Sequence, residues 1–175
     1  PEESQPVTAP RVPPHSVDTE TAVLSAWCLH DRFGKAWKPE PDLFYVPAHR
    51  VIAQAMAKLG PETRDEASVF AQLEADGTMD KAGGSGFVHR AIMGAPVYGD
   101  PWPHVSRLRE YKALRDIIRA ADAAVAEAYE HKNLGAMVTH LQEAMQLGAQ
   151  DVQSKVLSVA DMMRAVAIEM QSQRD

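Results

Sequence analysis

Apolar residues in the first hundred positions recur every three to four residues, which is the spacing of amphipathic helices. A first helix is predicted to begin near Ser16 or Asp18, because Ser16 can cap free backbone N–H groups. Its apolar positions are Val17, Val23, Leu24, Trp27 and Cys28. Pro47 is well placed as the first residue of a second helix. A third helix is predicted over residues 64–75, and a short fourth helix is predicted around Phe87.

The chain has no proline after Pro103, so its second part is predicted to form long helices. An unbroken helix over residues 104–131 would be about 40 Å long. Its apolar spacing is close to 3.5 residues, as in a helical hairpin or a coiled coil. A turn at 132–133 would lead to a second helix and complete an αα-hairpin. The predicted interface with a partner comprises Leu108, Tyr111, Arg115, Ile118, Val125, Leu134, Val138, Leu141 and Met145.

A break at residues 148–151 precedes a last amphipathic helix that runs to the end of the chain. Its apolar positions are Leu157, Ala160, Met163, Val166 and Met170. Two interpretations remain open: the helix folds back on the hairpin, or it docks on another subunit or a missing domain. The methionines suit adaptable docking surfaces.

No segment alternates apolar and polar residues as a half-buried strand would. The sequence therefore predicts an all-α protein, in which a small helical bundle is followed by a long αα-hairpin and a C-terminal linker helix. The predicted divisions are a proline-rich lead at 1–13, the bundle at 14–103, the hairpin at 104–148 and the linker at 149–175.

The formal net charge of −6 argues against a domain whose main task is to grip phosphate backbones. Four basic residues nevertheless lie near one stripe of the long helix: Arg109, Lys112, Arg115 and Arg119. Acidic residues at pairing distance along the helix interrupt this stripe, namely Glu110, Asp116 and Asp122. A self-paired, solvated face is the favoured interpretation, and a ridge for an acidic protein or single-stranded DNA is the alternative.

No catalytic, cofactor or metal site is predicted for this chain. The seven histidines lack metal-ligand spacing, and His15 and His49 are expected to cap or hydrogen-bond within the bundle. Gly83 and Gly84 indicate a tight turn, because no strand precedes them and no Lys-Ser/Thr follows. The lone Cys28 suggests a reducing cytoplasm and is interpreted as a small buried hydrophobe.

Four short motifs, in this order, resemble the N-terminal domain of the DnaB family of bacterial replicative DNA helicases. The first is Pro14-His15-Ser16 with Glu20 and Val23-Leu24, and the second is Phe44-Tyr45 with His49-Arg50-Val51-Ile52 and Met56. The third comprises Leu73, Gly77, Asp80, Gly83-Gly84 and Phe87, and the fourth is Arg109-Glu110-Tyr111-Lys112-Ala113-Leu114-Arg115. Departures at Asp18, Thr19, Ser25 and residues 97–103 suggest a divergent member.

The resemblance implies a non-catalytic collar domain that functions in DNA replication and primosome assembly. Its hairpins would pair into dimers, and three dimers would form a ring above six motor domains. It would recruit a DnaG-type primase; a helicase loader is a further partner that the resemblance allows. The domain would act on single-stranded DNA only indirectly, and it would not bind a membrane. ATP and Mg would belong to a motor domain beyond Asp175, in an ATP-dependent 5′–3′ DNA helicase.

A second hypothesis is a free-standing adaptor or inhibitor that has kept the collar fold and lost the motor. It would regulate helicase rings by mixed assembly. The gene beyond Asp175 separates the two hypotheses, since it encodes either a stop codon or a phosphate-binding loop.

Overall fold

The computed structural model describes residues 12–60, 62–95 and 99–130, together with the single positions 135, 138, 139, 142 and 146. All regular structure within this part of the chain is helical, which confirms the predicted all-α class. The helices are α1 (Val17–Leu29), α2 (Asp31–Ala36), a 3₁₀ turn η1 (Pro41–Leu43), α3 (Pro47–Lys58), α4 (Glu66–Ala75), α5 (Ser85–Met93) and α6 (Trp102–Tyr129).

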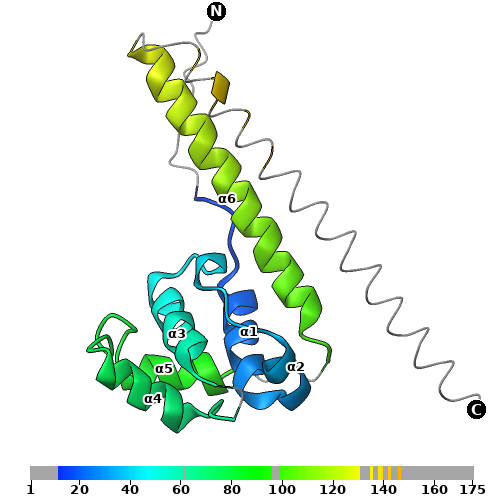
Figure 1. Ribbon diagram of the computed structural model, residues 1–175, viewed down its shortest axis with the longest axis vertical. Coiled ribbons are helices and arrows are strands. Elements are labelled where there is room, and N and C mark those ends of the chain that lie inside the picture. The colour runs from blue at the N-terminus through cyan, green and yellow to red at the C-terminus, as the bar shows by residue number, and fades with distance from the viewer. Residues whose placement is uncertain are drawn as a thin grey trace, which may run out of the picture.

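The five shorter α-helices form a bundle, and α6 starts beside this bundle and runs well past it (Figure 1). With 28 residues, α6 is about 42 Å long. Only its first half packs against α1 and η1. The second half of α6 therefore projects from the bundle. The second hairpin helix and the linker helix that the sequence predicts lie outside the described residues.

The helix starts that depend on local signals lie where the sequence predicts them. The Ser16 hydroxyl accepts a hydrogen bond from the Thr19 amide at 3.2 Å and caps α1. Pro47 is the first residue of α3. Gly83 and Gly84 have φ angles of +89° and +77°, which residues with a side chain rarely adopt, and they form the turn before α5.

The core of the bundle lies between α1, α3, α4, α5 and the start of α6. Its largest fully buried apolar side chains are Trp27, Phe44, Leu24, Ile52, Met56, Leu73, Ile92 and Leu108. Burying each contributes about 1.5–3 kcal/mol relative to leaving it exposed. One assignment was wrong: Val17 is 48% exposed and is not part of the buried face of α1.

No helix was predicted at the position of the short α2. Gly34 lies within this helix, where it permits a close approach. A Cβ atom at this position would collide with the Arg64 guanidinium and the Trp27 carbonyl. Arg64 donates to that carbonyl at 3.1 Å and to Asp31 at 2.8 Å, and these bonds join the α1–α2 corner to the segment before α4.

Candidate interaction surface

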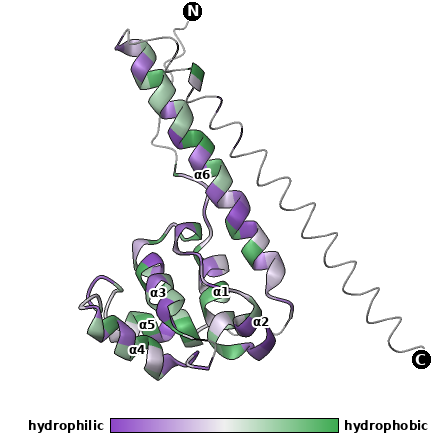
Figure 2. Ribbon diagram, in the orientation of Figure 1, coloured by the Kyte–Doolittle hydropathy of each residue, from purple (hydrophilic) through white to green (hydrophobic). Residues whose placement is uncertain are grey.

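From Leu114 to Tyr129, α6 carries a stripe of exposed apolar side chains, which we call the outer stripe. Its members are Leu114, Ile117, Ile118, Val125 and Tyr129. Leu114 is 47% exposed, Val125 55% and Tyr129 80%. Figure 2 shows apolar segments continuing along α6 beyond the bundle. Contiguous apolar surface of this kind typically marks a site of protein interaction.

A second apolar stripe of α6, roughly a third of a helical turn away from the first, faces the bundle. Val105 and Leu108 are fully buried in it, and Tyr111 packs against the same core. The apolar spacing predicted a single seam, whereas α6 has two stripes. The assignment of Leu108 to a partner interface needs correction, since this side chain is 0% exposed within the bundle's own core.

Arg115 joins α6 to the rest of the molecule. Its guanidinium donates to the Pro14 carbonyl at 3.1 Å and to the Leu43 carbonyl at 2.8 Å. The side chain is only 8% exposed, so it faces inward and is not on the outer stripe. Burial lowers the pKa of Arg115, whereas the nearby carboxylates of Glu20 and Asp116 raise it. An arginine in this setting keeps its charge and satisfies two backbone acceptors.

A buried carboxylate orders the segment that Arg115 contacts. Glu20, on α1, accepts hydrogen bonds from the Tyr45 amide at 2.7 Å, the Val46 amide at 3.2 Å and His49 Nδ1 at 2.9 Å. The start of α3 has no cap from its own residues, and Glu20 supplies the acceptor from a distant helix. The Tyr45 ring stacks on His15 with a centroid distance of 4.3 Å. The expectation that His15 and His49 hydrogen-bond within the bundle is confirmed.

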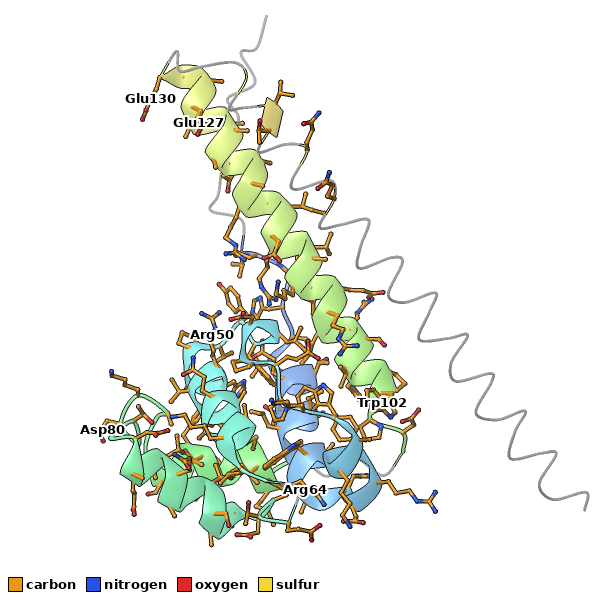
Figure 3. All side chains as sticks on the ribbon, in the orientation of Figure 1. Arg50, Arg64, Asp80, Trp102, Glu127 and Glu130 are labelled. Atoms are coloured by element: carbon orange, nitrogen blue, oxygen red, sulfur yellow. The ribbon has the colours of Figure 1, made fainter. Side chains whose placement is uncertain are left out.

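The charges of α6 are largely paired within the molecule. The Asp116 carboxylate accepts hydrogen bonds from both Lys112 and Arg119. Arg107 donates a hydrogen bond to Glu110, and Arg109 donates one to Glu40. The predicted self-paired face is therefore present along this part of α6. The outer end is acidic, and Figure 3 shows Glu127 and Glu130 there, far from Trp102 at the base.

The remaining interface residues of the sequence analysis fall into two groups. Ile118 and Val125 are on the outer stripe, and Val138 is also exposed. The others lie outside the described residues: Leu134, Leu141 and Met145 of the hairpin, and Leu157, Ala160, Met163, Val166 and Met170 of the linker. Their roles stay predictions.

Within the described ranges, no group of three or more His, Cys, Asp or Glu side chains could hold a metal ion. No helix among the same residues is long and apolar enough to cross a bilayer. Burial, aided by the nearby Asp65 carboxylate, raises the pKa of the Cys28 thiol to about 12. A thiol with such a pKa is a poor nucleophile at neutral pH.

Comparison with known proteins identifies relatives of this chain. A family model described as "DnaB-like helicase N terminal domain" matches residues 12–101. The replicative DNA helicase DnaB of Pasteurella multocida is 25% identical over 138 residues, which are 75% of this chain and 29% of the relative. The DnaB of Geobacillus stearothermophilus is 28% identical over 128 residues, 70% of this chain and 28% of the relative. The chain thus spans less than a third of either helicase.

A solved structure shares the fold. The crystal structure of the N-terminal domain of DnaB helicase from Mycobacterium tuberculosis superposes with a TM-score of 0.66. It is 24% identical in sequence, and the match covers 77% of this chain and 98% of that one.

Proposed function

Because this chain belongs to the DnaB-like helicase N-terminal domain family, we propose that it is the oligomerisation and partner-docking domain of a replicative DNA helicase. The single observation that carries this proposal is the outer stripe of α6, which stays exposed beyond the bundle. The domain supplies no catalytic group in this account. ATP, Mg and the unwinding reaction belong to a motor domain elsewhere in the parent protein, which acts in the cytoplasm.

The occupant of the outer stripe is a second copy of the chain. Leu114, Ile118 and Val125 recur at intervals of four and seven residues, so two such helices can pack their stripes against each other. Each large side chain that becomes fully buried contributes about 1.5–3 kcal/mol. An apolar ridge of this length on a helix that projects from its bundle favours pairing over exposure to water.

The pairs of hairpins would assemble further into the ring that the family resemblance implies, with three dimers above six motor domains. The same collar would recruit a DnaG-type primase and couple priming to unwinding. Of the predicted lead, bundle, hairpin and linker, the hairpin would mediate assembly in this arrangement. The linker helix would dock on a neighbouring motor domain.

Two measurements on the 175-residue chain test the proposal. Multi-angle light scattering at micromolar concentrations should show dimers or larger assemblies. Isothermal titration with the C-terminal region of the primase from the same organism should show saturable binding. A chain that stays monomeric and does not bind the primase would overturn the proposal.

A further inference from the structure

A pocket of about 530 Å³ lies where the middle of α6 passes the start of α3. It is lined by Pro13, Asp42, Tyr45, Arg50, Lys112, Arg115, Ile118, Arg119 and Asp122. Figure 3 shows Arg50 at the upper edge of the bundle, on the first turn of α3. The volume is within the range of about 300–1,000 Å³ that is typical of ligand sites.

The pocket is locally positive on an acidic chain. Four of its nine lining side chains are cationic, and two are carboxylates. Arg115 is fixed on backbone carbonyls and forms part of the wall. Lys112 and Arg119 both donate hydrogen bonds to the Asp116 carboxylate, which lies between them. These bonds keep the two cationic groups beside the pocket. The ammonium of Lys112 and the guanidinium of Arg119 each have further donors, so both can bind an added carboxylate.

Apolar groups lie next to these cations. Ile118 is 39% exposed and lines the pocket, as does Pro13. A ligand that combines carboxylates with an apolar side chain would contact both kinds of surface. Charge-assisted hydrogen bonds to Lys112 and Arg119 would fix the orientation of the carboxylates.

We infer that this pocket binds a short acidic peptide segment of a partner protein, with carboxylates on Lys112, Arg119 and Arg50 and an apolar side chain on Ile118. The inference rests on the proposed function for its setting, because a docking domain brings such partners to α6. The pocket shares Ile118 with the outer stripe, whereas the carboxylate contacts to Lys112, Arg119 and Arg50 do not depend on the pairing of that stripe.

The geometry favours a peptide over nucleic acid. Asp122 lines the outer side of the pocket, and beyond it the end of α6 carries Glu127 and the C-cap Glu130, with no basic residue over 120–130. This end of the helix repels a polyanion that continues along it. The Tyr45 ring has His15 stacked at 4.3 Å and the Arg115 guanidinium at 5.9 Å, so it offers little free face to a nucleobase.

Fluorescence anisotropy with the full chain tests the inference. The probe is a fluorescein-labelled decapeptide in which Asp and Glu alternate with Leu, and the reference is the same peptide with Asn and Gln in place of the acids. We expect saturable binding of the acidic peptide and about tenfold weaker binding of the neutral one. A chain that binds both peptides equally, or neither, would overturn the inference.

Variants of the pocket sharpen the test. The double variant Lys112→Gln/Arg119→Gln should bind the acidic peptide at least about tenfold more weakly. Lys81→Gln/Arg90→Gln removes the same charge from exposed positions outside the pocket and should bind as the parent does. Asp116→Asn should tighten binding severalfold, because it releases Lys112 and Arg119 from their shared partner. An unchanged affinity in the Lys112/Arg119 variant would contradict the assignment.

Two further readouts separate the possible failures. If the chain binds a fluorescein-labelled poly-dT oligonucleotide more tightly than the acidic peptide, the ligand of the pocket is single-stranded DNA. That result would overturn the inference. Light scattering of the Lys112/Arg119 variant should still show self-association. Loss of peptide binding in this variant with intact self-association would support the pocket assignment. A parent chain that is monomeric and still binds the peptide would contradict the proposed function and leave the pocket assignment in place.

Discussion

The imidazole Nδ1 of His49 lies 2.9 Å from a carboxylate oxygen of Glu20, although the two residues are 29 positions apart and both are almost wholly buried. The same carboxylate accepts hydrogen bonds from the Tyr45 and Val46 amides. The Glu20 side chain of α1 thus fixes the start of α3. It also orders the adjoining backbone at 42–45, whose carbonyls accept hydrogen bonds from Arg115 of α6. This chain of contacts joins α6 to the bundle in addition to the buried Val105 and Leu108.

Replacing Glu20 with Ala should destabilise the chain strongly. The change leaves two part-buried amides and the buried His49 imidazole without their acceptor, and breaking a buried pair in this way costs about 3–5 kcal/mol. Urea denaturation followed by circular dichroism measures the free energy of unfolding. Thr21→Ala on the exposed side of α1 is the control and should cost far less. A loss below about 1 kcal/mol for Glu20→Ala would contradict this role.

Replacing Arg115 with Met should loosen the attachment of α6. The Pro14 and Leu43 carbonyls would lose their donor, at a cost of about 1–3 kcal/mol for the buried Leu43 carbonyl and less for the part-buried Pro14 carbonyl. Arg115→Lys should rescue only part of this loss, since an ammonium cannot reproduce the planar fork of a guanidinium. Hydrogen exchange should show faster exchange in η1 and the first half of α6. Unchanged exchange in both segments would mean that Arg115 does not hold the helix.

The Asp65 carboxylate caps α4 and should make the chain sensitive to acid. Hydrogen bonds from the Ser68 amide and hydroxyl lower the pKa of Asp65. The folded-state pKa is therefore below the unfolded value of about 3.9. The stabilisation is present above that value and is lost as the pH falls through the folded pKa.

Thermal melts as a function of pH test this dependence. Asp65→Asn keeps a capping side chain that does not titrate, so its melting temperature should lie below the parent's at neutral pH. The gap should close as the pH falls below about 4. A gap that stays constant with pH would show that the charge of Asp65 contributes nothing to the cap.

Cys28 should react slowly with thiol reagents while the chain is folded. Its pKa is raised from 9.0 to about 12, so the thiolate fraction near pH 8 falls by about a thousandfold. The rate of reaction with Ellman's reagent in buffer and in concentrated urea measures the difference. A folded rate within tenfold of the unfolded rate would show that the pKa of the thiol is not raised in the folded chain, contrary to this prediction.

Local signals in the sequence were sufficient for most of the bundle. Ser16 as a cap, Pro47 as a first helical residue and Gly83-Gly84 as a turn each act through neighbours within a few positions. The burial of Glu20 and Arg115 could not be inferred in the same way. Their partners lie 25 to 101 positions away, and a charged side chain gives no sequence signal that its partners are buried.

The face of α6 was only partly predictable. A spacing near 3.5 residues shows that the helix has an apolar side, but the bundle covers Val105 and Leu108 while Leu114 and Val125 stay exposed on a neighbouring side. Two stripes a fraction of a turn apart have similar periodicity. Only the placement of the bundle in three dimensions distinguishes the stripe it covers from the stripe that remains for a partner.

Sedimentation equilibrium of three versions of the chain tests the central claim that the outer stripe of α6 is a contact between copies. Val125→Glu places a carboxylate on the stripe, and Ala123→Glu places one on another side of the same exposed helix. We expect the parent and Ala123→Glu to associate alike and Val125→Glu to associate at least about tenfold more weakly, because the carboxylate would be buried without a partner. Equal association of all three would contradict the account.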